Sequence, residues 1–415
     1  MISDTEIKKS HRNIILCQCT GLLAMQFMGN GIILNYLMKF GVKEDTTFLL
    51  LTFIPNIIGL LLTLPLAHLS DKVGLKKIGN RGNCLQVLGF VLLALAYFLP
   101  AYAVVIFSLA MVLYSLGGVL FASNWFALLD PLIEAETRGR FFARLRITWQ
   151  CVGITATFIV SNLILFSDSK KMYLGILVFG SLMLLVRIIF YQRIPELTKP
   201  NRSLGNIKES WHKLRQNRAY MKFSMYCFVM TFLVSGLASF LFLFEKGSLA
   251  FSEGQIVLMG FCAQAGSLLG YWVGAMVVDK RGTALLFNLV NFSYLVLVSL
   301  FIFIKFLPLP VELCAALFTF VLGVVFCAKG IGSTSEALRL VDKGAKSFGI
   351  GFSATTAACG GTFGSLLTVQ YLKFGGEWNW SVSSYAFGHY EIYLGFVFFG
   401  LIMVNIFFRF KEEQA

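Results

Sequence analysis

The chain has 415 residues, of which 57% are hydrophobic and only 13% charged, and its formal net charge is +14. About a quarter of the residues in an ordinary soluble domain are charged, so this composition excludes a soluble globular protein and indicates a polytopic membrane protein. The positive charge does not predict nucleic-acid binding, because the Lys and Arg residues lie in short segments between apolar runs. No nucleic-acid partner is therefore expected.

About twelve apolar runs follow one another, each long enough to cross a membrane as a helix. The predicted spans are residues 14–36, 48–70, 83–99, 101–123, 147–166, 172–192, 222–244, 255–277, 284–305, 310–330, 347–371 and 390–408. A polar segment at 194–221 separates the first six runs from the last six. We interpret it as a linker between an N-terminal half at 1–193 and a C-terminal half at 222–415, with a short helix around Trp211 on the inner leaflet.

Most of the 35 Lys and Arg residues fall in alternate segments, which share one side of the membrane. By the positive-inside rule, these segments, the linker and both termini are expected to be cytoplasmic. The longest segment predicted on the outside is 372–389, with aromatic residues at headgroup level. Compact loops favour the plasma (inner) membrane of a bacterium, with lipid around a monomeric protein.

The nine cysteines and four histidines do not form a recognisable site. Most cysteines lie within apolar runs and are interpreted as small buried residues, and no spacing is typical of metal ligands. An enzyme acting on lipid would need a nucleophile with a base, or a metal cluster, and the scattered histidines supply neither. The sequence therefore predicts a protein without cofactor or metal that is not an enzyme.

A short polar turn follows the second run and recurs after the eighth, at a spacing of about half the chain. The matching positions are Asp71, Lys72 and Gly74 in the first copy and Asp279, Lys280 and Gly282 in the second. Glycine allows a backbone conformation closed to other residues, so a helix can stop and reverse there. A repeat at this spacing predicts two homologous halves.

These features resemble the major facilitator superfamily, whose turn pattern reads roughly Gly-x-Leu-Ala-Asp-Arg-x-Gly-Arg-Arg. In the first copy Lys76 and the following Lys77 supply the basic residues after Gly74, but Leu75 stands where the family has a basic residue and Ala67 where it has its first glycine. Thr283 departs from the pattern in the second copy. The resemblance implies an all-α membrane fold of twelve transmembrane helices in two pseudo-symmetric halves. It also implies a transporter that works by alternating access.

The resemblance further implies that Asp71 pairs with cations of a neighbouring loop and meets a helix N-terminus from the other half. Arg138 or Arg140, in the loop after the fourth run, is expected within reach of Asp71. The predicted gating residues are Asp71, Lys72, Gly74, Arg138, Arg140, Asp279, Lys280 and Gly282. The alternative is a plain turn that only sets the topology, beside a solvated basic loop.

Polar side chains within the spans are the candidates for solute contact, because such transporters hold their solute near the bilayer midplane. The candidates are Gln26, Asn30, Asn35, Asn124, Trp125, Gln150, Ser235 and Gln264. Each of them has an alternative role in hydrogen bonding between packed helices.

Ionisable residues are few within the spans. Arg187, Lys329 and Glu336 are placed near the cytoplasmic ends, so no charge is predicted at mid-depth. We therefore expect a neutral or zwitterionic small solute. Intramembrane acids and histidines commonly mark proton relays, which leaves three weak candidates for proton coupling. They are His68, Glu245 and Glu312.

Two alternative functions stay open. The first is a drug or metabolite efflux antiporter, although the fifth run contains Gly153 without the Gly-Pro motif of drug/proton antiporters. The second is a membrane sensor derived from a transporter, which would bind a solute without moving it.

Overall fold

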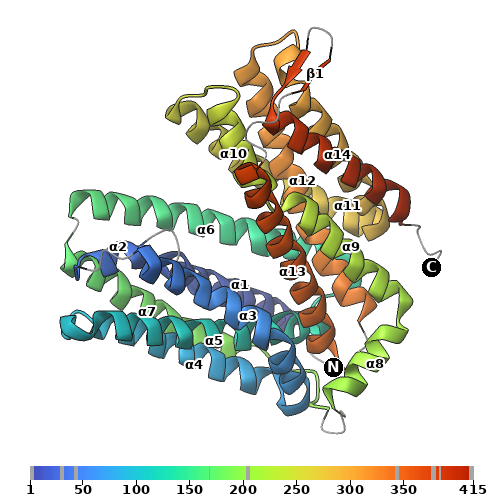
Figure 1. The fold of residues 1–415 in the computed structure, drawn as a ribbon. Coiled ribbons are helices and arrows are strands. Elements are labelled where there is room, and N and C mark those ends of the chain that lie inside the picture. The colour runs from blue at the N-terminus through green and yellow to red at the C-terminus, as the bar shows by residue number, and fades with distance from the viewer. Residues whose placement is uncertain are drawn as a thin grey trace. The chain divides into compact units, whose positions relative to one another are not determined.

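The computed structural model describes residues 4–28, 32–41, 45–167, 169–201, 206–341, 345–374, 380–382 and 385–410 (Figure 1). The chain divides into two compact units. Unit 1 comprises Met1–Glu134, Leu145–Leu214 and Val341–Thr355, and unit 2 comprises Ala135–Arg144, Arg215–Leu340 and Thr356–Ala415. Each unit therefore contains one short segment from the other half of the sequence.

Unit 1 is built mainly from the helices of the first half. These are α1 (Asp4–Met28), α2 (Ile32–Met38), α3 (Asp45–Val73), α4 (Leu75–Leu95), α5 (Ala103–Leu129), α6 (Arg138–Phe166), α7 (Lys170–Gln192) and α8 (Ile207–Gln216). Short 3-10 turns η1 (Pro100–Tyr102) and η2 (Asp130–Leu132) also belong to unit 1, whereas η3 (Ala135–Thr137) and the first turns of α6 belong to unit 2. Helix α4 packs beside α5 and α7, and α7 also packs against α1. Helix α8 lies in the predicted linker and extends the short helix expected there.

Unit 2 contains the helices of the second half and one hairpin. The elements are α9 (Arg218–Val234), α10 (Leu237–Gly247), α11 (Glu253–Ile302), η4 (Ile304–Phe306), α12 (Val311–Leu340), α13 (Lys346–Phe374), β1 (Trp380–Val382), β2 (Tyr385–Phe387) and α14 (His389–Phe407). The antiparallel strands pair Trp380 with Phe387 within the predicted outer segment. The sequence analysis did not predict this hairpin.

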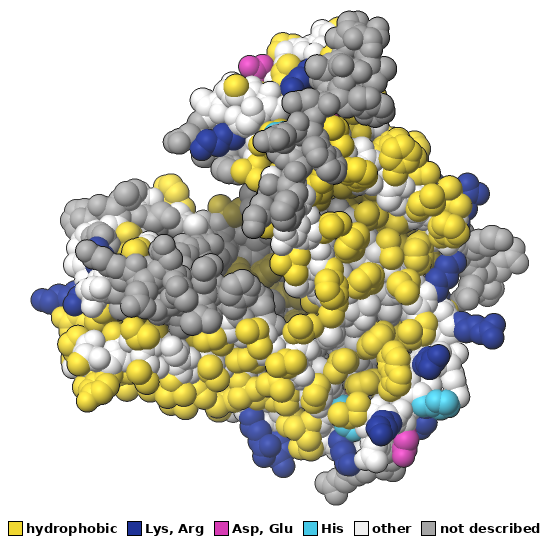
Figure 2. Space-filling view, viewed as in Figure 1, with side chains coloured by type: hydrophobic (Ala, Val, Ile, Leu, Met, Phe, Trp, Pro, Cys, Tyr) yellow, Lys and Arg dark blue, Asp and Glu magenta, His cyan; other side chains and the backbone are white. Residues whose placement is uncertain are grey.

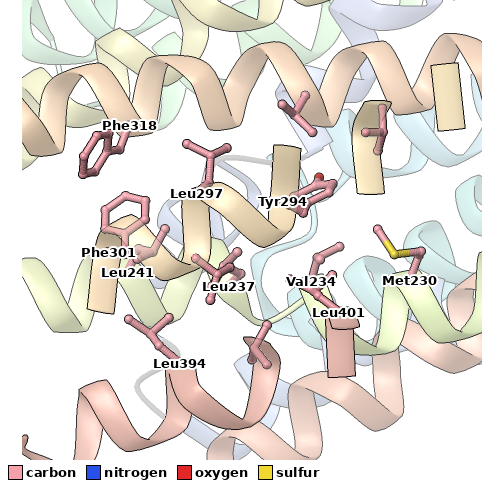
Figure 3. Close-up of a cluster of buried hydrophobic side chains, with 14 of the residues drawn as sticks. Met230, Val234, Leu237, Leu241, Tyr294, Leu297, Phe301, Phe318, Leu394 and Leu401 are labelled. Carbon is pink, nitrogen blue, oxygen red and sulfur yellow. The ribbon is translucent and has the colours of Figure 1, made fainter. Parts of the chain in front are cut away.

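Apolar side chains from α9 to α12 and α14 form the core of unit 2 (Figure 3). In a membrane the association of helices depends on close packing, for which small residues are suited. Gly266, Gly270 and Gly274 recur every fourth residue on α11 and lie directly against the α12 backbone. This regular spacing is visible in the sequence.

Among the described residues, seven helices are long and apolar enough to cross a membrane. Figure 2 shows hydrophobic side chains spread over the helical surface, with Lys and Arg side chains mostly near helix ends. The fold is therefore that of an all-α, multi-pass membrane protein apart from the hairpin, and the order of elements fits twelve spans. The runs at 255–277 and 284–305 form one continuous helix, α11, with a non-helical residue at Gly282.

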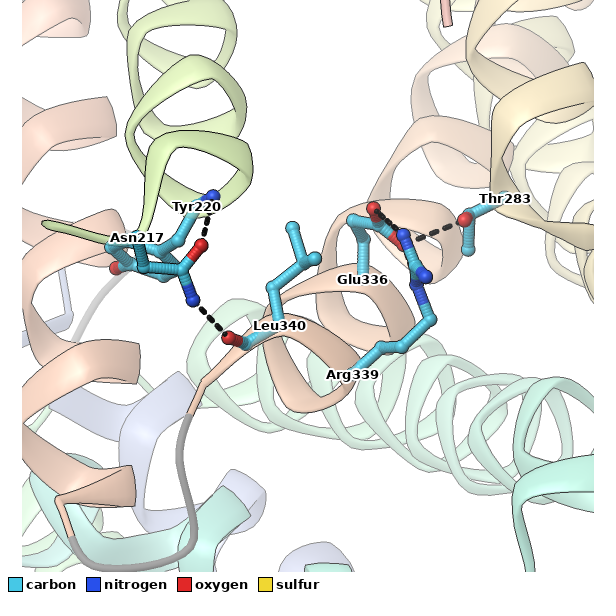
Figure 4. Close-up of polar contacts among 6 residues, drawn as sticks. All are labelled: Asn217, Tyr220, Thr283, Glu336, Arg339 and Leu340. Atoms are coloured by element: carbon cyan, nitrogen blue, oxygen red, sulfur yellow. Dashed lines mark hydrogen bonds and ion pairs between the residues drawn. The ribbon is translucent and has the colours of Figure 1, made fainter. Parts of the chain in front are cut away.

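Two helices extend about ten residues beyond their predicted spans. Helix α6 begins at Arg138 and α12 ends at Leu340. In α12, Glu336 accepts hydrogen bonds from the Thr283 hydroxyl at 2.6 Å and the Arg339 guanidinium at 2.8 Å (Figure 4). Asn217 donates to the carbonyl of Leu340 at 3.0 Å. Polar side chains are thus satisfied within a helix that hydropathy alone ended too early.

Candidate functional site

Both repeated turns contain a glycine with a backbone conformation that other residues rarely adopt. Gly74 has a φ of 123° and stands alone between α3 and α4. Gly282 has a φ of 77° within α11. Because neither conformation suits a residue with a Cβ, the glycine of the repeat is required by the backbone at both places.

Asp71 caps the N-terminus of α13 within unit 1. Its carboxylate accepts the backbone N–H of Ser347 at 3.0 Å and of Phe348 at 2.9 Å. Asp71 is 8% exposed. The first backbone N–H groups of a helix have no partner within it, and the helix dipole favours a negative charge there. We call this arrangement the first capping contact.

Asp279 makes the equivalent arrangement in unit 2, the second capping contact. Its carboxylate accepts the backbone N–H of Gly139 at 2.7 Å and of Arg140 at 2.9 Å, in the first turn of α6. A Cβ on Gly139 would lie 2.6 Å from an Asp279 oxygen and 2.8 Å from the carbonyl of Ala275. Glycine at position 139 therefore allows the close approach.

One of the two expected partners of Asp71, Arg140, takes part in the second capping contact. Arg140 forms an ion pair with Asp279 at 3.2 Å, and its side chain is 70% exposed. Arg138 begins α6 in unit 2, whereas Asp71 belongs to unit 1. Arg140 therefore contacts the acid of the second turn, and the predicted approach of Arg138 or Arg140 to Asp71 stays a prediction.

The linker surrounds the first turn. Glu196 accepts the backbone N–H groups of Leu75 at 2.7 Å and Lys76 at 3.2 Å, so it caps α4. The N–H of Asn201 donates to the carbonyl of Asp71 at 2.9 Å. Among the other predicted gating cations, Lys72 has an exposed side chain. The linker thus adds hydrogen bonds on both sides of Gly74.

Helix α8 also packs against the first capping contact. Ser210 and the His68 ring are in hydrogen-bond contact at 3.3 Å, and His68 lies edge-on to Phe348 at 6.0 Å. Trp211 packs on Phe352 of α13, with ring centroids 5.0 Å apart. His68 is 7% exposed. His68, a predicted proton carrier, is therefore buried beside the first capping contact, where it packs against α8 and α13.

An ion pair lies next to the start of α13. Lys346, the first residue of α13, pairs with Asp130 of η2 within unit 1. Both side chains are largely buried. Asp130 neutralises the charge of Lys346. Lys346 therefore does not compete with the backbone N–H groups of α13 for the Asp71 carboxylate.

The predicted solute-binding residues of unit 1 fall into two groups. Gln26 and Gln150 are half-buried on α1 and α6, and Asn35 is half-buried on α2. Gln26 lies against Gly153, where an added Cβ would be 2.9 Å from its amide nitrogen. Asn30 lies outside the described residues.

Asn124 and Trp125 form the second group, which is fully packed. Asn124 is 0% exposed and accepts the Tyr191 hydroxyl at 3.1 Å. The Trp125 ring stacks on Phe121 at 4.9 Å. Phe121 belongs to α5 itself, and the Trp125 ring also stacks on Tyr191 of α7 at 6.4 Å. The contacts with Tyr191 join α5 to α7, so the structure supports packing roles for both residues.

Arg187 is a buried cation that the sequence analysis placed at a helix end. It is 6% exposed and donates to the side-chain oxygen of Gln86 at 2.7 Å. Its guanidinium lies 3.6 Å from the ring centroid of Phe121, and Gly21 of α1 leaves room beside it. Arg187 therefore joins four helices of unit 1 and does not extend to the membrane surface.

In unit 2, Ser235 lies where the seventh run divides into α9 and α10. Its hydroxyl donates to the carbonyl of Gly361 on α13 at 3.0 Å. Gln264 is exposed on α11, and Lys280 is exposed beside the second turn. Glu312 is exposed at the start of α12, whereas Glu245 is 4% exposed on α10.

Comparison with known proteins identifies the family. The sequence model of the Major Facilitator Superfamily matches residues 16–365, which is most of the chain. The chain belongs to the Major Facilitator Superfamily. This is a family of membrane transporters and not of enzymes, so a transport function is supported. No curated protein sequence matches the chain.

Solved structures with the same fold are distant in sequence. A bacterial homologue of the iron transporter ferroportin, in its outward-facing state, gives a TM-score of 0.76 at 12% identity, over 96% of this chain and 98% of that chain. FucP in its outward conformation gives 0.70 at 13% identity, over 97% and 100%. The human organic anion transporter MFSD10 (TETRAN) gives 0.66 at 17% identity, over 95% and 99%. These similarities show the facilitator fold.

Proposed function

We propose that the protein moves a small solute across the membrane by alternating access, and that the two capping contacts hold one side closed. Each contact joins a turn from one half of the sequence to a helix from the other half. This exchange is the observation that carries the proposal, because a contact of this kind must break when the halves separate. The Lys and Arg distribution supports a cytoplasmic location for these contacts and for both termini.

The fold alone does not identify the solute. The similar structures are a homologue of an iron transporter, a fucose:proton symporter and an organic anion transporter. These substrates differ widely in charge. We infer a small polar solute, with the half-buried Gln26 and Gln150 of unit 1 as its proposed contacts. The expectation of a neutral or zwitterionic solute depended on placing Lys329 near the cytoplasmic end of its span.

A reversible disulfide tests the closing role. Ala67 and Gly351 face each other in unit 1, where a Cβ on Gly351 would lie 3.1 Å from the Cβ of Ala67. That separation is close to the range of disulfide Cβ atoms. We expect oxidation of the Ala67→Cys/Gly351→Cys double variant to stop transport, and a reductant to restore it. Each single variant, treated with the same oxidant, is the control.

Transport itself is tested with the purified protein in liposomes without ATP. Radiolabelled fucose, glycine and lactate serve as neutral, zwitterionic and anionic probes. Uptake of one probe that the disulfide blocks reversibly would support the proposal. A probe that binds in a saturable manner but never enters the liposomes would instead favour the sensor alternative. Uptake unaffected by the disulfide would remove the closing role of the first capping contact.

A further inference from the structure

Lys329 lies within α12, two helical turns before the polar contacts of Glu336 near the end of that helix. Glu336 is bonded to Thr283 and therefore marks the level of the Gly282 turn. Lys329 lies two helical turns before Glu336 on α12, which is about 10 Å deeper at 1.5 Å per residue. A lysine side chain is shorter than this distance, so Lys329 does not reach the level of the Gly282 turn by extending along the helix.

Lys329 has no counter-ion in the part of the chain that the structure describes. Its side chain is partly exposed, and it forms no ion pair or hydrogen bond with a described residue. Its electrostatic neighbour is the thiol of Cys227 on α9, which carries no compensating charge when protonated. A protonated amine at this depth therefore requires water or an external anion to stabilise it.

The helix face around Lys329 is open within unit 2. Phe326 and Ser333 lie three residues before and four residues after Lys329, so the three share one face of α12. Phe326 is 62% exposed. The adjacent side of α12 is packed on α11, where Ala328 meets Gly274 and Gly332 meets Phe287. Lys329 thus lies at the edge of this packed seam, between it and the exposed face of Phe326.

Of the environments available to such a face, hydrocarbon is unfavourable for a lysine. Charged side chains within spans almost always face a bundle interior or a water-filled cavity, and they mark pathways for substrates or ions. Lys329 is the one cation among the described side chains on the membrane-embedded part of this face. A single ammonium group matches a single negative charge.

We propose that Lys329 lines the solute pathway and binds a small solute through its one carboxylate group. This inference rests on the proposed transport function and makes its substrate class specific. It replaces the neutral expectation, because that expectation assumed that no cation lies at depth. A zwitterion that presents its carboxylate to Lys329 belongs to the same class, whereas a sugar or an amide does not.

Cysteine labelling tests whether position 329 faces water. The background variant carries Cys84→Ser and Cys151→Ser, because these two native cysteines are exposed. Lys329→Cys in proteoliposomes should react with a charged methanethiosulfonate reagent, supplied on both sides, at least tenfold faster than Leu317→Cys. Leu317 is the matched control, since it is 56% exposed on α12 about 120° around the helix from Lys329. Equal rates would overturn the proposal.

Thermal stabilisation of the purified full-length protein tests the substrate class. The probes are acetate, lactate, benzoate and glycine, with lactamide and benzamide as neutral counterparts. We expect at least one carboxylate to raise the Tm while its amide does not, by preferential binding to the folded state. Lys329→Met should abolish the shift, and Lys329→Arg should keep part of it. A panel without any Lys329-dependent shift would overturn the proposal.

The two proposals fail in different ways. Fucose uptake that is blocked by the Ala67–Gly351 disulfide but unchanged in Lys329→Met would keep alternating access and overturn the carboxylate site. Lys329-dependent binding of lactate without any uptake would keep the site and remove the transport function. Lactate uptake lost in Lys329→Met and retained in part by Lys329→Arg would support both.

Discussion

Asp71 and Asp279 each accept hydrogen bonds from the second and third residues of a helix, and the four N–O distances lie between 2.7 and 3.0 Å. Their surroundings differ. The first turn is covered by the linker, and an added Cβ at Gly74 would meet Pro200 at 3.4 Å. An added Cβ at Gly282 would meet nothing within 4 Å. The repeat therefore supplies the capping geometry, and the linker supplies the asymmetry.

The asymmetry has a physical consequence for how each contact breaks. Opening the first contact must also disturb the packing of His68 and Trp211 between α8 and α13. Opening the second contact separates a carboxylate from two backbone N–H groups and one exposed arginine. We therefore expect the first contact to hold more strongly, and substitutions can measure the difference.

The largest expected effect comes from the two glycines. Gly74→Ala and Gly282→Ala should each lower stability by roughly 1–3 kcal/mol, because alanine is strained at their positive φ angles. Thermal unfolding of the purified variants measures the loss. Gly175→Ala is the control, since Gly175 lies within α7 and an added Cβ meets nothing within 4 Å. A neutral Gly282→Ala would show that the two turns are not equivalent.

Neutralising the carboxylates should give the next largest effect. Asp71→Asn removes a buried charge from the start of α13, where charge at a helix N-terminus contributes up to about 2 kcal/mol. We expect the first contact to open roughly tenfold more often, measured by the labelling rate of a cysteine at position 351. Asp279→Asn should raise labelling at position 139 by a larger factor, because Asp279 supplies both the cap and the ion pair of the second contact, whereas the contacts of α8 remain in Asp71→Asn.

A reversed order would contradict the role given to the linker. If Asp71→Asn released its helix more readily than Asp279→Asn, the contacts of α8 would not stabilise the first turn. Cysteine at position 139 itself disturbs Asp279, because of the 2.6 Å approach there. Labelling at position 143, one turn further along α6, is therefore the safer report on the second contact.

The sequence predicted the fold class and the glycines of the two turns, but it did not predict the contact of Arg140 with Asp279. Helix α13 is the fifth span of its half and α6 is the fifth span of the other. Once Asp71 was expected at the N-terminus of a helix from the other half, the repeat alone would have placed Asp279 at the start of α6. The repeat of the two turns therefore contains the information that places Asp279 at the start of α6.

Helix ends were predicted least well, because hydropathy measures membrane preference and not helix formation. The polar residues from Lys329 to Leu340 continue α12, since Glu336 pairs with Arg339 three residues later. The contacts of Glu196 and Ser210 could not be predicted at all, because they join segments far apart in the sequence without any repeat to relate them.

A smaller effect is expected at Glu196, which acts on the first turn alone. Glu196→Gln keeps the size of the side chain but removes the charge that caps α4, so stability should fall by about 0.5–1 kcal/mol. Labelling at position 351 should rise slightly, and labelling at position 143 should not change. An equal rise at both positions would mean that the linker acts on the whole fold and not on the first turn.

The smallest expected effect is at Arg140, and it separates charge from backbone capping. The Arg140 side chain is 70% exposed, so its ion pair with Asp279 is screened by solvent and is worth at most about 0.5 kcal/mol. Arg140→Gln leaves both backbone hydrogen bonds to Asp279 in place. Labelling at position 143 should therefore change less than in Asp279→Asn, and added salt should remove what change there is. If Arg140→Gln raised labelling at position 143 as much as Asp279→Asn, the second contact would be an ion pair and not a helix cap. Asp279 would then not be equivalent to Asp71.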